Sequence, residues 1–290
     1  MIYIICGPTG SGKTEVAKQF SDYFHAPIVN ADAFQIYKDM NIGTAKISKE
    51  DPYYKKHYLL DIKEPSENFS VMEYQKLFRE TVNELSKDHK DIIVCGGTGL
   101  YIRASIYDYE FNEEVADSDD FEDMDNESLY GLLQKLDYDA SLKIHPNNRK
   151  RVIRAINIAK TQKETKSENI AKQKHELLYD VKVLMLNPPR DKLYENINQR
   201  VDEMFNQGLV DEVKGLLTQY ELSRTAKAAI GYKEVIDYLN GIISLDECKE
   251  LIKKRTRNYA KRQVTFFKNQ FQLEMFERKE ELLNKYLRGK

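Results

Sequence analysis

The sequence predicts an α/β fold: a doubly wound parallel sheet with a helical insertion and a helical C-terminal part. Short apolar runs alternate with helical patterns over the first hundred residues, and the pattern becomes mainly helical after Tyr101. A further apolar run appears at residues 181–188. Strands separated by helices favour a parallel sheet, because parallel strands need a crossover connection. A chain of 290 residues allows one large or two smaller domains, and we expect two.

The first part of the chain supplies most of the sheet. The predicted strands are residues 2–6, 27–31 and 91–95, and the predicted helices between them are residues 13–24 and 70–87. Helical stretches follow at residues 126–136 and 148–161, and then a polar, lysine-rich segment at 162–176 that lacks clear periodicity. This middle part is typical of an insertion into the sheet domain.

The end of the chain returns to the core. Residues 181–188 predict a strand that Pro188 and Pro189 terminate. Everything after this strand is predicted to be helical, in segments at 191–207, 210–220, 232–239 and 245 to about 271. We therefore predict a core formed by residues 1–110 and 181–290, and a small helical insertion domain formed by residues 111–180.

A glycine-rich loop follows the first predicted strand. Its residues are Gly7, Pro8, Thr9, Gly10, Ser11, Gly12, Lys13 and Thr14. This is a phosphate-binding loop (P-loop) in the strand–loop–helix context that it requires. Its backbone N–H groups, the helix dipole and the lysine all favour a phosphate, and the threonine is placed to bind magnesium. The fold is therefore predicted to be P-loop NTPase-like, with a diphosphate as part of the ligand.

The P-loop does not settle the reaction. P-loop hydrolases and kinases usually carry a magnesium-linked Asp at the end of a second strand, yet the strand at 91–95 runs into Gly96-Gly97-Thr98-Gly99 without an acid. The nearest candidate is Asp32, which follows the strand at 27–31, at the edge where ligands gather in parallel sheets. An Asp in this position is also a common cap or turn residue. On these observations its role stays open.

Charge and composition indicate which ligands and which cellular location the protein is expected to have. The net charge is −2, but residues 113–127 hold nine acids and no Lys or Arg, whereas residues 252–268 hold seven basic residues and no acid. The basic stretch suits a polyanion, although a solvated helix face gives the same pattern. The three Cys are widely spaced, which favours buried, reduced thiols. The five His lack the spacing of metal ligands, so we predict no zinc site. Without a signal-peptide layout or a membrane-length apolar run, we expect a cytoplasmic protein.

Four further segments follow the P-loop in order. They are Asp32-Ala33-Phe34-Gln35-Ile36-Tyr37 with Asn41-Ile42-Gly43-Thr44-Ala45-Lys46, then Gly96 to Tyr101, then His145-Pro146-Asn147-Asn148 through Arg151 and Arg154, then Ala229-Ile230-Gly231-Tyr232-Lys233-Glu234. With the P-loop they resemble the bacterial tRNA dimethylallyltransferase family, from Gly7 to about Asn269. The Asp-x-x-Gln-x-Tyr block with Gly-Thr-Ala-Lys is specific, and a generic P-loop kinase is not expected to have it.

The resemblance implies transfer of a dimethylallyl group from dimethylallyl diphosphate to N6 of the adenosine 3′ of the anticodon (position 37) in tRNA, with release of diphosphate. The P-loop would hold the diphosphate with Mg²⁺ at Thr14, and ATP need not be a substrate. Asp32 matches the catalytic Asp and would be the general base for the amine. Thr98 matches a threonine that contacts the target nucleotide or the donor. The target base would leave its stack and enter a channel.

The resemblance also implies an RNA-binding surface for the anticodon stem-loop. Its expected residues are Asp32, Ala33, Phe34, Gln35, Thr98, Lys150, Arg151, Arg154, Arg255, Arg257, Lys261 and Arg262. Arg190 and Arg200 would close over the diphosphate. The acidic stretch 113–127 would face away from RNA or solubilise the insertion.

Several of these residues have a second interpretation. Gln35 fits the adenine edge and equally fits a loop-stabilising amide. Thr98 also fits an ordinary turn. Phe34 and Tyr101 fit either a channel lining or the core.

The sequence departs from the family pattern at three positions: Ala33 stands where a serine is common, Ala228 where Gln or Arg is expected, and Phe266 where a tryptophan is common. The resemblance is to the form without the eukaryotic zinc-finger extension, so we expect a minimal bacterial enzyme and a monomer.

Two other functions remain open on the sequence alone. A small-molecule or nucleoside kinase would share the P-loop and form ADP, and a non-catalytic RNA-binding module would not need Asp32.

Overall fold

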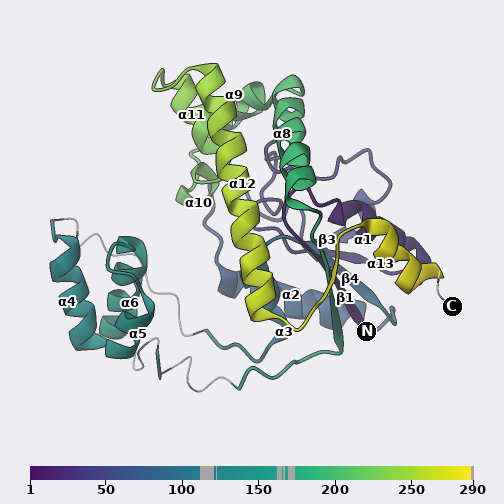
Figure 1. Ribbon diagram of the computed structural model, residues 1–290, viewed down its shortest axis with the longest axis horizontal. Helices are drawn as coiled ribbons and strands as arrows, with labels where there is room; N and C mark the ends of the chain where they lie inside the picture. The colour runs from purple at the N-terminus through teal and green to yellow at the C-terminus, as the bar shows by residue number, and fades with distance from the viewer. Residues whose placement is uncertain (112–120, 122, 162–164, 166, 169–173, 289–290) are drawn as a thin grey trace. The chain divides into compact units, whose positions relative to one another are not determined.

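The computed structural model describes residues 1–111, 121, 123–161, 165, 167–168 and 174–288 (Figure 1). The chain divides into two compact units. Met1–Ile106 and Tyr179–Lys290 form the first unit, and Tyr107–Leu178 form the second. None of the helices in the described ranges is both long and apolar enough to cross a membrane.

A parallel sheet forms the centre of the first unit. Its strands are β1 (Ile2–Cys6), β2 (Ile28–Asn30), β3 (His57–Tyr58), β4 (Ile92–Gly96), β5 (Val181–Leu186) and β6 (Glu274–Phe276). Their order is β3-β2-β4-β1-β5-β6, and every pairing is parallel. All five residues of β4 are buried, which explains its continuous apolar run. The predicted doubly wound parallel sheet is confirmed.

The two edge strands were not predicted. β6 pairs with β5, whereas the pattern after residue 188 predicted only helix, so that prediction was wrong for residues 274–276. β6 has only three residues, and its central residue Met275 is 48% exposed. β3, at the other edge, has only two residues. Strands this short at the edge of a sheet carry too little apolar alternation to be detected.

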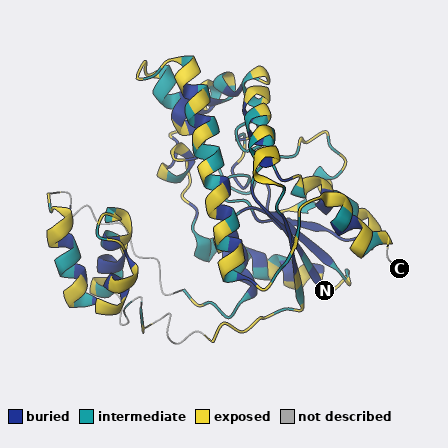
Figure 2. Ribbon diagram, viewed as in Figure 1, coloured by how far each residue is buried: buried dark blue, intermediate teal, exposed yellow. Residues whose placement is uncertain are grey.

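One face of the sheet is covered by α1 (Lys13–Phe24) and α13 (Lys279–Leu283). Val16, Phe20 and Leu282 from these helices join strand residues in one buried hydrophobic cluster. The three free cysteines, two of them in strands, are also buried, as predicted. Figure 2 shows the buried sheet between partly exposed helices.

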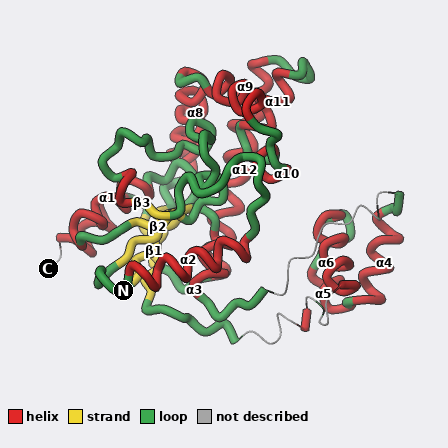
Figure 3. The backbone as a smooth tube through the Cα atoms, turned by 180° about the vertical axis from the view of Figure 1, so that it is seen from behind, coloured by secondary structure: helices red, strands yellow, loops and turns green. Residues whose placement is uncertain are grey.

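The opposite face is covered by α2 (Val71–Leu85) and α3 (Gly99–Ile106), as Figures 1 and 3 show. α2 is tied to the sheet because the Tyr74 hydroxyl donates a hydrogen bond to the Asn30 carbonyl oxygen over 2.8 Å. Helices on both faces leave the ends of the strands as the open edge of the core.

The rest of the first unit is mainly helical. Its elements are η1 (Tyr54–Lys56), α8 (Arg190–Asn206), α9 (Leu209–Gln219), α10 (Arg224–Lys227), α11 (Tyr232–Leu239), α12 (Leu245–Gln270) and η2 (Asn284–Arg288). α12 has 26 residues and begins at a capping box, in which Ser244 and Glu247 satisfy each other's backbone N–H groups. The predicted helices of this part are confirmed within a few residues, and the single turn α10 was not predicted.

The second unit is a small helical bundle of α4 (Asn126–Leu136), α5 (Tyr138–Lys143) and α6 (Arg149–Thr161). Its core is formed by Phe121, Leu129, Leu133, Ala140, Ile144, Val152, Ala155 and Ile156. The helices expected at 126–136 and 148–161 are present, and α5 is additional. Most of the acidic stretch 113–127 lies outside the described residues.

Candidate active site

Three loops meet at the carboxyl edge of the sheet. β1 leads into the P-loop, β2 leads to Asp32, and β4 leads to Gly97 and Thr98. Because β1 and β2 both pair with β4 in parallel, these loops leave the sheet on the same side. The sequence-predicted phosphate, base and threonine positions are thereby brought together.

The P-loop backbone requires its glycines. Gly7 has φ +148°, and a Cβ there would lie 2.3 Å from the carbonyl oxygen of Leu186 on β5. Gly10 and Gly12 have φ +80° and +87°, values that other residues adopt only with strain. α1 then begins at Lys13, which directs the N–H groups of its first turn toward the loop.

Helix α8 holds the P-loop from one side. The side-chain amide of Asn196 donates to the carbonyl oxygen of Gly10 over 3.1 Å, and the Arg200 guanidinium donates to the Thr9 hydroxyl over 3.3 Å. Arg200 therefore lies at the P-loop, where sequence reasoning expected an arginine to close over the diphosphate.

Helix α12 holds the P-loop from another side. The Gln263 side-chain oxygen accepts from the backbone N–H of Thr9 over 3.0 Å, and its amide nitrogen donates to the carbonyl oxygen of Gly97 over 2.9 Å. One buried amide thus bridges the loops after β1 and β4. Sequence reasoning missed Gln263, because a single Gln inside a basic helix carries no local signal for burial.

Two cations lie close together in this site. Burial lowers the pKa of Lys13, and the charge of Arg200 lowers it further, while Asp32 opposes the change. Burial also lowers the pKa of Arg200, again against the effect of Asp32. Two partly desolvated cations with one carboxylate leave positive charge that a bound anion would neutralise.

Asp32 lies in a turn that its neighbours fix. The Asn30 side-chain oxygen accepts from the backbone N–H of Asp32 over 3.2 Å, and the Asn30 amide donates to the Leu59 carbonyl oxygen over 3.1 Å. Asp32 Oδ1 accepts from the backbone N–H of Phe34 over 3.0 Å. The turn-forming role considered for Asp32 is therefore present, and it uses one carboxylate oxygen.

Thr98 joins the loop after β4 to the loop that carries Asp32. Its hydroxyl oxygen accepts from the backbone N–H of Ala33 over 3.0 Å, and its own N–H donates to the Ala31 carbonyl oxygen over 3.1 Å. A Cβ at Gly96 would lie 2.1 Å from that carbonyl oxygen, so the close approach requires glycine. Thr98 and Asp32 consequently belong to one fixed unit.

Two cavities lie beside the P-loop and Asp32, with volumes of about 330 Å³ and 270 Å³. The larger one, the phosphate cavity, is lined by the P-loop and by polar residues. The smaller one, the apolar cavity, extends toward α8, α12 and the segment before α11. Its apolar lining includes Ile197, Val201, Met204, Ile230 and Ile252. The residues common to both cavities are Thr9, Lys13, Asp32, Thr44 and Arg200.

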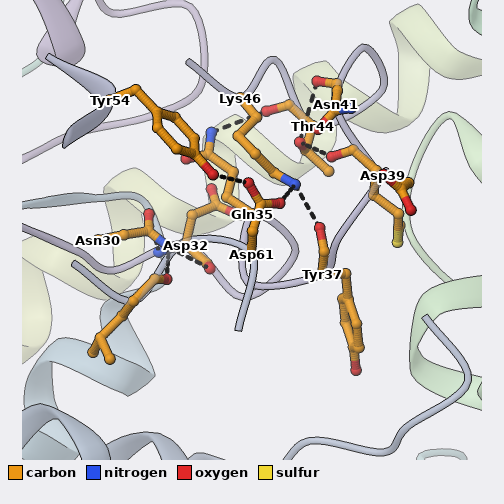
Figure 4. Close-up of polar contacts among 12 residues, drawn as sticks. Asn30, Asp32, Gln35, Tyr37, Asp39, Asn41, Thr44, Lys46, Tyr54 and Asp61 are labelled. Atoms are coloured by element: carbon orange, nitrogen blue, oxygen red, sulfur yellow. Dashed lines mark hydrogen bonds and ion pairs between the residues drawn. The ribbon is translucent and has the colours of Figure 1, made fainter. Parts of the chain in front are cut away.

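Gln35 holds the loop 41–46 in place (Figure 4). Its side-chain amide donates to the carbonyl oxygens of Thr44 and Ala45 over 3.1 and 3.4 Å. Gln35 also lines the phosphate cavity. The loop-stabilising interpretation therefore describes its amide nitrogen in this structure.

The same loop ends in a buried ion pair. Lys46 Nζ donates to Asp61 Oδ1 and to the Tyr37 carbonyl oxygen, both over 2.5 Å, and the Tyr54 hydroxyl donates to Asp61 Oδ2 over 2.5 Å. Burial lowers the pKa of Lys46, while Asp61 opposes the change. Burial together with Asp61 raises the pKa of Tyr54 to about 12. Figure 4 shows this network beside the turn of Asp32.

Glu212 on α9 fixes the beginning of that loop. Its carboxylate accepts from the backbone N–H groups of Asn41, Ile42 and Gly43 over 3.0, 2.7 and 3.1 Å, and from the Tyr232 hydroxyl over 2.6 Å. Three successive N–H groups around one carboxylate form an anion-binding nest. Sequence reasoning missed Glu212, because it lies 170 residues from Ile42.

The basic residues of α6 lie in the second unit. Lys150, Arg151 and Arg154 are exposed. Arg149, next to them, donates to the Met124 carbonyl oxygen over 2.6 Å and so supports the bundle. The role of the three exposed residues in RNA binding remains a prediction.

The four basic residues expected on α12 differ in their surroundings. Arg255 forms an ion pair with Glu234, whose side chain is 1% exposed, and Arg257 donates to the Asn198 side-chain oxygen over 2.6 Å. Lys261 and Arg262 are exposed, and Arg262 also lines the apolar cavity. The structure therefore gives Arg255 and Arg257 intramolecular partners.

Other residues singled out in the sequence occupy different environments. Phe34 and Ala228 line the apolar cavity. Tyr101 is 7% exposed and stacks on Tyr74 with ring centroids 4.2 Å apart, so it belongs to the core. The Arg190 guanidinium lies 5.1 Å from the ring centroid of Tyr194 and is not among the lining residues of either cavity.

Phe266 packs against the first residue of α3. A Cβ at Gly99 would lie 2.4 Å from the Phe266 ring, so this ring closes directly over the glycine. The Phe266 ring on α12 is thus in contact with the start of α3, directly after Thr98.

The phosphate cavity has the oxygen donors that magnesium would use. Thr14, in the first turn of α1, and Asp32 both line it. Within the described ranges, no group of three or more His, Cys, Asp or Glu side chains is placed to hold a metal. Mg²⁺ in phosphate sites usually keeps water and takes one or two protein oxygens with substrate phosphates. The Thr14 hydroxyl and the Asp32 carboxylate could supply the protein oxygens that bind such an ion.

Comparisons with known proteins agree on one family. The IPP transferase family matches residues 35–270. The tRNA dimethylallyltransferase of Bacillus licheniformis is 41% identical over 304 residues, which cover 100% of this chain and 97% of that protein. The enzyme of the same name from Anoxybacillus flavithermus is 42% identical over 279 residues, covering 95% and 90%.

Solved structures give the same result. A tRNA isopentenylpyrophosphate transferase from Staphylococcus epidermidis has a TM-score of 0.71 and 34% identity, with 100% of this chain and 99% of that chain covered. A eukaryotic dimethylallyltransferase acting on tRNA has a TM-score of 0.81 and 26% identity, with 100% and 76% covered.

Proposed function

The chain belongs to the IPP transferase family, and we propose that it transfers the dimethylallyl group of dimethylallyl diphosphate to N6 of the adenosine 3′ of the anticodon in tRNA. The products are N6-modified adenosine at position 37 and diphosphate. The curated relatives named tRNA dimethylallyltransferase match this chain over almost their whole length, which supports the same reaction here.

The observation that carries this proposal is the junction of the two cavities at Lys13, Asp32 and Arg200. An allylic diphosphate has an anionic end and a short apolar end. The P-loop side offers N–H groups and cations for the first, and the apolar cavity offers aliphatic side chains for the second. The bond that breaks, between the allylic carbon and the diphosphate oxygen, would lie at the junction beside Asp32.

Departure of diphosphate builds negative charge on the leaving oxygen. The P-loop N–H groups, Lys13 and Arg200 would stabilise that charge, because they are already fixed before the substrate arrives. Mg²⁺ held at Thr14 would neutralise part of the diphosphate charge when bound. The allylic carbon can carry positive character, so a weak nucleophile can attack it.

The attacking amine must lose a proton as the new bond forms. The C–N bond forms as the C–O bond breaks, and we propose that the N6 proton passes to Asp32 Oδ2. Oδ1 is held by the N–H of Phe34, so the carboxylate has a fixed orientation. Thr98 is proposed to contact the reacting groups through the loop that it shares with Ala33.

The target adenosine would reach Asp32 only after leaving its stack in the anticodon loop. We propose that it contacts the segment from Asp32 to Gln35, and that Lys261 and Arg262 bind the nearby RNA. Lys150, Arg151 and Arg154 on the second unit are proposed to bind another part of the stem-loop. We further propose that the enzyme acts as a monomer in the cytoplasm.

The test is a reaction with purified protein, magnesium, dimethylallyl diphosphate and unmodified tRNA, without ATP. Mass spectrometry of the digested tRNA should show one adenosine, beside the anticodon, heavier by a five-carbon prenyl group. Omission of magnesium tests whether the reaction requires this ion. ATP consumption with phosphorylation of a small molecule, and no prenyl adduct, would instead establish the kinase alternative.

A further inference from the structure

Helix α1 carries a third cation at the phosphate cavity. Lys18 lines this cavity together with Lys13 and Arg200. Lys13 and Arg200 also line the apolar cavity, whereas Lys18 is not among its lining residues. Lys13 and Arg200 therefore lie at the junction of the two cavities, and Lys18 lies in the part of the phosphate cavity beyond that junction.

The position of Lys18 on α1 directs its side chain toward the P-loop. Lys18 is four residues after Thr14, so the two residues lie on one face of the helix, and both line the phosphate cavity. Side chains on a helix tilt toward its N-terminus. The Lys18 ammonium is thus carried back toward Thr14 and the end of α1 that binds phosphate.

Asp51 holds the Lys18 ammonium at the wall of the cavity. Lys18 Nζ donates to Asp51 Oδ2 over 2.5 Å, and the two side chains are 19% and 25% exposed. The same ammonium lies 5.1 Å from the ring centroid of Tyr53, whose backbone N–H donates to Asp51 Oδ1 over 2.9 Å. Asp51 is not among the residues that line the phosphate cavity. The carboxylate therefore positions the cation from outside the cavity.

Lys18 keeps hydrogen-bond donors for a ligand. An ammonium has three N–H donors, and within the described ranges Lys18 donates to Asp51 and to no other residue. Glu15 also lines the phosphate cavity, but it is exposed and its carboxylate accepts from the Gln19 side-chain amide over 3.1 Å. A fixed ammonium with spare donors suits a phosphate oxygen.

We propose that Lys18 binds the outer phosphate of the donor, which is the phosphate that is not bonded to the allylic carbon. This inference rests on the proposed function. The apolar cavity fixes the allylic end of the donor at the junction, so the inner phosphate lies beside Lys13 and Arg200 and the outer phosphate lies further along the phosphate cavity. Lys18 is then the residue that distinguishes a prenyl diphosphate from the corresponding monophosphate.

The experiment measures the binding of three probes to the full chain in the presence of Mg²⁺. The probes are dimethylallyl diphosphate, inorganic diphosphate and dimethylallyl monophosphate. Lys18→Met should weaken the binding of both diphosphates by about 10-fold, the effect of one charge-assisted hydrogen bond. The monophosphate should bind with unchanged affinity, because its prenyl group holds its phosphate at the junction. Lys18→Arg keeps the charge and should bind all three probes as the wild-type protein does.

Two further variants separate contact with the ligand from support of the fold. Lys56 belongs to the same cluster, because it pairs with Asp22 over 2.9 Å and lies 4.9 Å from the Tyr53 ring centroid, but it is not among the lining residues of the phosphate cavity. Lys56→Met is the matched control and should bind the diphosphates normally. Lys18→Met with Asp51→Asn leaves no unpaired carboxylate and should show the same loss as Lys18→Met. It replaces the single variant if thermal unfolding shows that variant to be misfolded.

Wild-type affinity for the diphosphates in Lys18→Met would overturn the inference, as would an equal loss of affinity for the monophosphate. Recovery of affinity in the double variant, or an equal loss in Lys56→Met, would also overturn it, because the lysine would then act through the fold alone. Wild-type protein that binds inorganic diphosphate without prenyl transfer to tRNA would contradict the proposed reaction. The binding of inorganic diphosphate to the variants would still decide the role of Lys18.

Discussion

Lys46 donates to Asp61 across an ion pair in which 1% of the lysine side chain and 10% of the aspartate side chain are exposed. Both ends of the pair lie on loops beside Asp32, and Ala45 and Asp61 have left-handed backbone angles, with φ +47° and +51°. Left-handed φ at residues other than glycine has a cost that the surrounding contacts must offset. The pair therefore holds together two loops that would otherwise relax.

Replacing Lys46 with methionine should destabilise the protein by about 3–5 kcal/mol, because Asp61 then stays buried without its counter-charge. Urea unfolding of the single and double variants measures this effect. Lys46→Met with Asp61→Asn should recover a large part of the loss, since no buried charge is left. Additive losses in the double variant would show that the two side chains act independently.

Replacing Asp32 with asparagine should lower kcat by about 10²–10⁴-fold while the affinities for tRNA and dimethylallyl diphosphate change little. The asparagine oxygen can still accept from the N–H of Phe34, so the turn should survive. Single-turnover prenyl transfer and separate binding titrations check both parts. Full activity in Asp32→Asn would remove the proposed base.

Replacing Gly43 with alanine should destabilise the protein by about 1–3 kcal/mol, because the new Cβ would lie 2.4 Å from the Tyr232 ring. Gly215→Ala on α9 is the control, since its Cβ meets nothing within 4 Å and alanine favours a helix. Thermal unfolding compares the two variants. A Gly43→Ala protein as stable as Gly215→Ala would show that the loop shifts without cost.

The affinity for the diphosphate should fall as the pH rises, and it should do so at lower pH than for an ordinary lysine. Burial lowers the pKa of Lys13, so its ammonium loses its proton and its charge earlier. Titration of dimethylallyl diphosphate binding from neutral to alkaline pH measures the change. Lys13→Met should bind more weakly at neutral pH and lose this pH dependence, and an unchanged profile would assign it to another group.

Replacing Arg255 with alanine should act first on stability, by about 1–3 kcal/mol, because Glu234 is buried and loses its partner. Lys261→Ala removes an exposed charge from the same helix and should leave stability unchanged while it weakens tRNA binding. Unfolding and stem-loop binding of both variants separate the two effects. If the Arg255→Ala variant is as stable as the wild-type protein, the ion pair with Glu234 is not the main role of Arg255, and direct RNA binding is again the expected role.

The sequence was sufficient where the determinants of a feature are contiguous. All P-loop residues lie between Gly7 and Thr14, and their glycines, lysine and helix start can be recognised together. The contacts that position this loop come from afar. Gln263 is 254 residues from Thr9, and Glu212 is 169 residues from Gly43. In the sequence alone, Gln263 and Glu212 cannot be distinguished from surface residues, because their hydrogen-bond partners are distant along the chain.

The Gln263 amide has a thermodynamic consequence. The same helix that reaches both substrate loops through Gln263 carries exposed basic residues on its outer side. If tRNA shifts α12 when it binds, the hydrogen bond from Thr9 to Gln263 transmits that shift to the P-loop. Thermodynamic linkage then requires each substrate to change the affinity of the enzyme for the other by the same factor. Donor affinity measured with and without the anticodon stem-loop gives that factor, and a ratio of one would mean that the two substrates load independently.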